Sequence, residues 1–152
     1  MQGFGNKKKS KKKEIYHLKN NKDYYQILNQ AIKYQTAGNI VQAIQYYEFL
    51  IKKGLQESAV FTNYGIILIN LGRFKEAVFS IRKAIKLNPR DATLHSNLGG
   101  ILKNLGRLEE AELSIRKAIE LNPNFVDAYS NLGVILKDLG KLEEAERLYR
   151  KA

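Results

Sequence analysis

The sequence predicts an all-α protein, a solenoid of antiparallel helix pairs, from three regularities. Residues 58–91 align without gaps to residues 92–125 and match at 19 of 34 positions, and residues 126–152 continue the same register. Seven of the 11 glycines and both prolines recur at fixed positions of this period. The large apolar residues recur at steps of three and four, as on one face of a helix. Such a period is typical of stacked two-helix units.

Residues 1–22 form a lysine-rich tail that we predict to be disordered. The segment holds eight lysines against one acid, whereas the whole chain has a net charge of +11. With few large apolar groups, it cannot bury enough surface to offset the entropy of ordering. The tail could bind a polyanion or a membrane surface, or it could be a solvated extension. The lysines of the candidate contact are Lys7, Lys8, Lys9, Lys11, Lys12 and Lys13.

Residues 24–57 form the first and most divergent unit. Its apolar spacing and Gly38 fit a helical hairpin, because a glycine at the fifteenth position ends the first helix in a left-handed cap. Leu50 and Leu55 stand where the later units have alanine and proline. An atypical terminal unit is normal in repeat arrays, so we include this one in the array.

Residues 58–91 and 92–125 are the regular units, and each is predicted to be a helical hairpin. The second helix begins with acidic residues such as Glu109 and Glu110, which interact favourably with the helix dipole. An Asn-Pro pair ends that helix, because proline disfavours the helical conformation in the preceding residue.

Small residues predict close packing within each hairpin. Glycine at position eight is expected to face alanine at position twenty, so that the two helices approach closely. The glycines are Gly65, Gly99 and Gly133, and the alanines are Ala43, Ala77, Ala111 and Ala145.

Residues 126–152 form a fourth, truncated unit. The sequence stops within its second helix, before any Asn-Pro pair. We therefore expect Leu142, Leu148 and Tyr149 to leave an exposed apolar patch, and the chain to be part of a longer protein.

These units resemble the tetratricopeptide repeat family, over residues 24–152. The positions favoured by the family are matched by Leu98, Gly99, Leu102, Ala111, Ile115, Ala118 and Pro123. The resemblance implies a right-handed superhelical solenoid whose first helices line a concave groove, with positions 2, 5, 6, 9, 12 and 13 pointing into it. It does not specify a function, because such repeats serve many unrelated ones.

The predicted groove carries an asparagine at position six of every unit. These residues are Asn29, Asn63, Asn97 and Asn131. An amide offers donors and an acceptor, so such a row can pair with the backbone of an extended peptide of any sequence. The row resembles the asparagine ladder of O-linked N-acetylglucosamine transferases. In the alternative interpretation, the amides bond to neighbouring helix backbone and hold the stacking angle.

The other candidate groove residues carry hydroxyl or ammonium groups. They are Thr62, Ser96 and Ser130 at position five, and Lys103 and Lys137 at position twelve. In the favoured interpretation, the two lysines instead form a solvated rim of the groove. Positions 2, 5 and 6 lack the Lys or Arg with which chaperone-binding members of the family clamp a carboxylate, so a co-chaperone role is disfavoured.

No catalytic, cofactor or metal site is predicted. The chain has no cysteine, which excludes disulfides, zinc-thiolate sites and a cysteine nucleophile. Its two histidines, His17 and His95, have no plausible metal partners, and His95 stands where the neighbouring units have aromatic residues. There is no apolar run long enough to span a membrane.

The sequence leads to one main functional hypothesis and two alternatives. The main hypothesis is a protein-interaction scaffold, not itself an enzyme, that binds extended peptide segments in its groove. In the first alternative, the chain is the N-terminal, substrate-selecting region of a glycosyl-, sulfo- or methyltransferase. In the second, the lysine tail binds polyanions or membrane surfaces. The lack of a signal peptide and of cysteines favours a cytoplasmic location.

Overall fold

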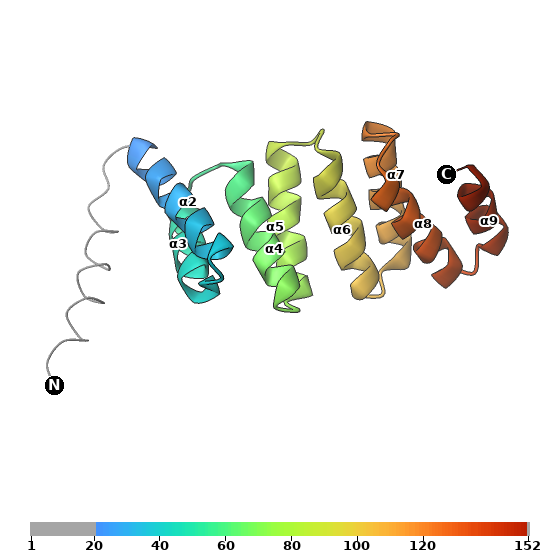
Figure 1. Cartoon of the computed structure of the whole chain (residues 1–152), viewed down its shortest axis with the longest axis horizontal. Coiled ribbons are helices and arrows are strands. Elements are labelled where there is room, and N and C mark those ends of the chain that lie inside the picture. The colour runs from blue at the N-terminus through green and yellow to red at the C-terminus, as the bar shows by residue number, and fades with distance from the viewer. Residues whose placement is uncertain (1–20, 152) are drawn as a thin grey trace, which may run out of the picture. The chain divides into compact units, whose positions relative to one another are not determined.

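The computed structural model describes residues 21–151, and these residues form eight helices and no strand (Figure 1). The predicted all-α fold of antiparallel helix pairs is confirmed. The described residues divide into two compact units, one ending at Leu55 and the other beginning at Gln56. The lysine cluster of the predicted tail lies outside the described residues. Asn21 and Lys22, which we assigned to the tail, are instead the first residues of a helix.

The first compact unit is a single hairpin of α2 (Asn21–Thr36) and α3 (Ile40–Lys52), which pack against each other. The hydroxyl of Tyr47 donates a hydrogen bond to Oε1 of Gln35 at 2.7 Å and so joins the two helices. Leu50, which departs from the pattern of the later units, is fully buried. The larger side chain at this position therefore belongs to the core of the hairpin.

The second compact unit consists of three hairpins in succession. Its helices are α4 (Ser58–Asn70), α5 (Phe74–Leu87), α6 (Ala92–Asn104), α7 (Leu108–Leu121), α8 (Val126–Asp138) and α9 (Leu142–Lys151). Each first helix packs against the second helix of its own hairpin, and α5 and α7 also pack against the first helix of the next hairpin (Figure 1). The large aliphatic side chains between these helices form one continuous core. Stacking therefore buries apolar faces that a single hairpin would leave exposed.

The turn inside each of these hairpins uses glycine as predicted, and Gly106 is an example. Its φ of +72° lies in the left-handed region, where a side chain would be strained. The amide of Arg107 then donates to the carbonyl of Leu102 at 2.9 Å, which closes the end of α6. This geometry reverses the chain and starts α7 immediately.

The close packing inside the hairpins differs in detail from the expectation. A Cβ added to Gly99 would lie 2.5 Å from both Cδ1 and Cγ1 of Ile115, and 3.2 Å from the backbone oxygen of Ala111. Gly99 thus meets first the side chain at position twenty-four and only then the backbone at position twenty. The reason is size, because the isoleucine side chain reaches farther across the interface than the alanine methyl group.

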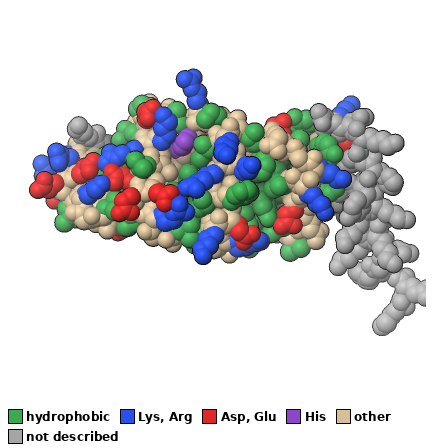
Figure 2. Space-filling model, turned by 180° about the vertical axis from the view of Figure 1, so that it is seen from behind, with side chains coloured by type: hydrophobic (Ala, Val, Ile, Leu, Met, Phe, Trp, Pro, Cys, Tyr) green, Lys and Arg blue, Asp and Glu red, His purple; other side chains and the backbone are tan. Residues whose placement is uncertain are grey.

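Ion pairs join the second helices of neighbouring hairpins. Arg82 of α5 pairs with Glu110 of α7 at 3.2 Å, and Arg116 of α7 pairs with Glu144 of α9. Figure 2 shows acidic and basic side chains intermixed at the α9 end of the molecule. The pairs are largely exposed, so each contributes little by itself.

Glu112 is the most enclosed member of this network, with a side chain only 12% exposed. It accepts hydrogen bonds from Arg116 at 2.8 Å and from Lys141 at 2.7 Å. Burial alone would raise the pKa of the Glu112 carboxyl, but the bonds from Lys141 and Arg116 outweigh burial, and the pKa lies below its ordinary value. Glu112 thereby connects α7 to the residue that precedes α9.

Glu112→Gln should therefore destabilise the protein by about 0.5–1 kcal/mol at neutral pH, because it removes both ionic contacts. A carboxyl whose pKa is lowered by folding stabilises the protein above its unfolded pKa and loses that contribution as the pH falls through the folded value. The difference between variant and wild type should shrink below about pH 4.5. Urea denaturation of the variant and the wild type at pH 7 and pH 3 measures this difference in stability. Glu146→Gln, at the equivalent exposed position of the next hairpin, is the control, and an equal difference at both pH values would contradict the account.

Candidate functional site

The first helices of the second unit each present one face to the core and one to solvent. On α6, Leu94, Leu98, Ile101 and Leu102 are buried. The residues at positions 2, 6, 9 and 13 of the same helix are partly or fully exposed, and they follow each other at steps of three and four. We call the corresponding surface of α4, α6 and α8 the amide face. It consists of Ala59, Asn63, Ile66 and Asn70; Thr93, Asn97, Gly100 and Asn104; and Asp127, Asn131, Val134 and Asp138.

The amide face holds three of the four predicted asparagines. Asn63, Asn97 and Asn131 are all partly exposed. None of the three side chains forms a hydrogen bond with another residue of the described part of the chain. Because α5 packs against both α4 and α6, and α7 against both α6 and α8, the three amides occupy equivalent places in successive hairpins. Asn29 is exposed on α2, in the first compact unit.

The three hydroxyl groups at position five differ from one another. The Thr62 hydroxyl donates to the backbone oxygen of Ser58 at 2.8 Å, so its hydrogen is committed to its own helix. Ser96 is buried, with 7% of its surface exposed. Ser130 is exposed. These three residues occupy the same position of the repeat, but their exposure to solvent differs from one hairpin to the next.

The two lysines at position twelve lie beside the amide face. Lys103 is partly exposed and Lys137 is exposed. Neither forms an ion pair with any residue between 21 and 151. Their ammonium groups therefore remain available to a ligand or to water.

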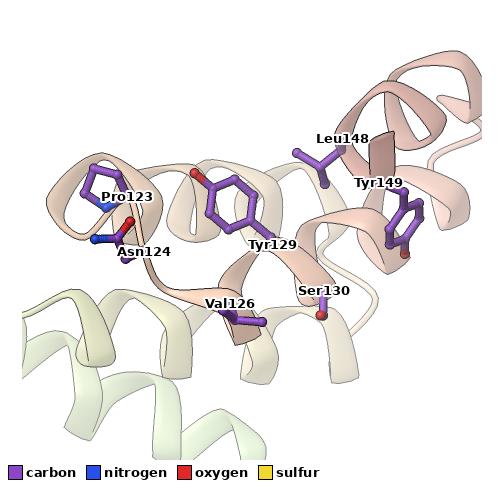
Figure 3. Close-up of a pocket in the computed structure, with 7 residues that line it drawn as sticks. All are labelled: Pro123, Asn124, Val126, Tyr129, Ser130, Leu148 and Tyr149. Carbon is purple, nitrogen blue, oxygen red and sulfur yellow. The ribbon is translucent and has the colours of Figure 1, made fainter. Parts of the chain in front are cut away.

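A pocket of about 500 Å³, which was not predicted from the sequence, lies at the end of the second unit (Figure 3). Tyr129 and Ser130 contribute to it from α8, and Leu148 and Tyr149 from α9. Pro123, Asn124 and Val126 complete its lining. Two of the lining residues, Leu148 and Tyr149, were singled out in the sequence, but as members of an exposed apolar patch. Tyr149 is indeed half exposed, whereas Leu148 packs partly against the core.

The groups able to hold a metal ion are scattered. Across residues 21–151, no three His, Cys, Asp or Glu side chains come close enough to form such a site. Nε2 of His95 lies 3.0 Å from the backbone oxygen of Pro89, so the imidazole contacts the loop that precedes its own helix. No helix of the described part is long and apolar enough to cross a membrane.

Comparisons with solved structures identify similar helical-repeat proteins. A crystal structure of MamA aligns with a TM-score of 0.83 and 22% identity, covering 99% of this chain and 93% of MamA. YrrB, described as "a TPR protein with an unusual peptide-binding site", aligns with a TM-score of 0.76 and 26% identity, covering 84% of this chain and 64% of YrrB. The Thermobaculum terrenum O-GlcNAc transferase aligns with a TM-score of 0.67 and 25% identity, covering 78% of this chain and 23% of the transferase.

Comparisons of sequence agree with the structural ones. No curated protein is similar enough to match. Family models described as tetratricopeptide repeats match residues 58–91, 92–125 and 115–147, which together span more than half of the chain. The chain therefore belongs to the tetratricopeptide repeat family.

Proposed function

We propose that the chain is a protein-interaction scaffold whose amide face binds an extended segment of a partner protein. The observation that carries the proposal is the row of three equivalent asparagines, Asn63, Asn97 and Asn131, whose amides are accessible and make no hydrogen bond within the described residues. Each amide can donate and accept at once, as the backbone of an extended peptide requires. The alternative role, bonding to neighbouring helix backbone, receives no support from these contacts.

The spacing of the amides suits an extended chain. Packed helices lie about 8–10 Å apart, and an extended peptide advances about 3.3 Å per residue. Asn97 and Asn131, on the contacting helices α6 and α8, would therefore engage backbone groups about three residues apart. A segment of roughly eight to ten residues would cover all three hairpins of the second unit. The similarity to YrrB, whose description names a peptide-binding site, supports a peptide as the ligand.

The test is to select peptide ligands from a random library and to map where they bind. A phage-displayed library of random 12-residue peptides would be panned on the full chain, and a selected peptide titrated into isotope-labelled protein. We expect the largest NMR shift changes at the side-chain amides of Asn63, Asn97 and Asn131 and along α4, α6 and α8. Shift changes concentrated on α5 and α7, or in the pocket beside Tyr149, would show that the amide face is not the binding surface.

A second candidate function is substrate selection for a transferase. It is favoured by the similarity to the Thermobaculum terrenum O-GlcNAc transferase, of whose length this chain covers less than a quarter. The same amide face would then bind segments of the acceptor protein. This candidate requires a catalytic domain encoded downstream of residue 152, and sequencing the gene beyond that codon tests it directly.

The lysine-rich segment supports a separate prediction about polyanions. If residues 1–22 bind them, the affinity for heparin or duplex DNA should fall steeply between 50 and 200 mM salt, because lysine–phosphate or lysine–sulfate contacts release counterions. Deleting these residues should abolish the binding and leave the helical circular dichroism almost unchanged. Binding that survives the deletion would place the polyanion contact on the folded units instead.

A further inference from the structure

Gly100 is unusual among the glycines that the structure describes. The turn glycines, such as Gly106, have a positive φ that favours glycine. The position-eight glycines, such as Gly99, lie so close to the opposite helix that a Cβ would clash. Gly100 alone in the described chain shows neither feature, because its φ is not positive and a Cβ added to it would meet no atom within 4 Å.

The fold therefore gives no reason for glycine at this position. Gly100 lies inside α6, four residues before the last residue of that helix. In a helix interior, glycine is less stable than alanine, because it loses more backbone freedom on folding. The sequence retains a destabilising residue where alanine would fit, and packing does not explain it.

The location of Gly100 suggests a role in binding. It lies on the amide face, three residues after Asn97 and so one helical turn away from that amide. The equivalent residues of the neighbouring hairpins are Ile66, which is partly exposed, and Val134, which is 40% exposed. Position nine thus forms an apolar row in which the middle side chain is missing. A Cβ added to Gly100 would meet no atom within 4 Å, and we call this open space, which lies on the same face as Ile66, Val134 and the amide of Asn97, the recess.

We propose that this recess at Gly100 is the specificity pocket of the amide face and receives a large apolar side chain of the bound segment. The inference rests on the proposed function. The asparagines would hold the peptide backbone, and Ile66 and Val134 would contact the ligand side chain from either side. An apolar side chain is the occupant that fits, because the position-nine residues of the neighbouring hairpins, Ile66 and Val134, are both aliphatic.

The test compares variants that fill the recess. Peptides selected on the wild-type chain should share one large apolar residue, such as Leu, Ile, Met or Phe, at a fixed place. Gly100→Ile, which installs the side chain found at Ile66, should weaken the binding of these peptides at least tenfold, since it fills the space that their apolar side chain would occupy. Gly100→Ala should have a smaller effect. Lys86→Ile, which adds the same side chain at an exposed site on α5, should leave binding unchanged.

A peptide variant makes the test specific to the recess. Replacing the shared apolar residue of the peptide by alanine should weaken binding to the wild type at least tenfold, yet have little effect on binding to Gly100→Ile. This non-additivity would assign the contact to the pair. Circular dichroism and melting of Gly100→Ile establish that it is folded.

Two results would overturn the inference in distinguishable ways. If peptides map to the amide face by NMR but bind Gly100→Ile as tightly as the wild type, the recess is not a specificity pocket and the proposed function stands. If the selected peptides map to another surface, both the recess and the proposed function are wrong.

Discussion

Replacing Asn63, Asn97 and Asn131 together by alanine should weaken the binding of selected peptides by about 1.5–4.5 kcal/mol. The estimate takes about 0.5–1.5 kcal/mol for each lost hydrogen bond and assumes that the three sites act independently. Because backbone contacts carry no side-chain specificity, the loss should be similar for peptides of unrelated sequence. Fluorescence anisotropy with several labelled peptides measures it.

Folding of the triple variant should change little. The three amides are accessible to water and are not hydrogen-bonded within the described residues, so alanine leaves no buried group unpaired. Asn88→Ala, at an exposed position of the loop between α5 and α6, is a control that should alter neither binding nor melting. A markedly lower melting temperature combined with unchanged peptide affinity would contradict the proposal and support the stacking role of the amides.

The secondary structure was predictable because successive units carry the same turn and helix-end residues at the same positions. A single Gly106 or Pro123 is a weak indication of a helix end. The same residue type at the same place in successive units is a strong one. These signals act within a few residues of the chain, where backbone preference dominates, so the turns and helix ends followed the prediction.

Contacts between units were harder to predict, because they depend on how far individual side chains reach. The period placed Ser96 and Ser130 at one position, yet one is buried and the other exposed. Glu112 pairs with Lys141, which lies 29 residues away in the chain, and no local sequence pattern predicts this contact. For the same reason, the sequence named Ala111 as the neighbour of Gly99, whereas the longer Ile115 side chain lies closer.

The candidate site combines both kinds of information. The asparagine row was visible in the sequence because it follows the period, but its hydrogen-bonding state was not. The sequence supports two interpretations of Asn97 equally, and they differ in the hydrogen bonds that the amide would make. Gly100 shows the opposite case. The sequence shows only that Gly100 adjoins Gly99. The structure shows that a Cβ would clash at Gly99 and would meet open space at Gly100.

The adjacent glycines Gly99 and Gly100 should respond oppositely to the same substitution. Gly99→Ala places a methyl group 2.5 Å from two atoms of the completely buried Ile115 side chain and 3.2 Å from the backbone oxygen of Ala111. Such overpacking destabilises a core by about 1–3 kcal/mol. Gly100→Ala meets no atom within 4 Å and should stabilise the protein by about 0.5–1 kcal/mol.

The pair is its own control, because both substitutions lie in α6 and gain the same helix propensity. The difference between their free energies of unfolding, measured by urea denaturation, therefore isolates the overpacking, and we expect about 1–3 kcal/mol in favour of Gly100→Ala. Trimming the opposing side chain in Gly99→Ala/Ile115→Val should recover part of the loss, since it removes the Cδ1 atom that a Cβ on Gly99 would strike. If the two single variants are equally stable, α6 and α7 can move apart at little cost. The close approach at Gly99 would then be permitted by the fold without being required by it.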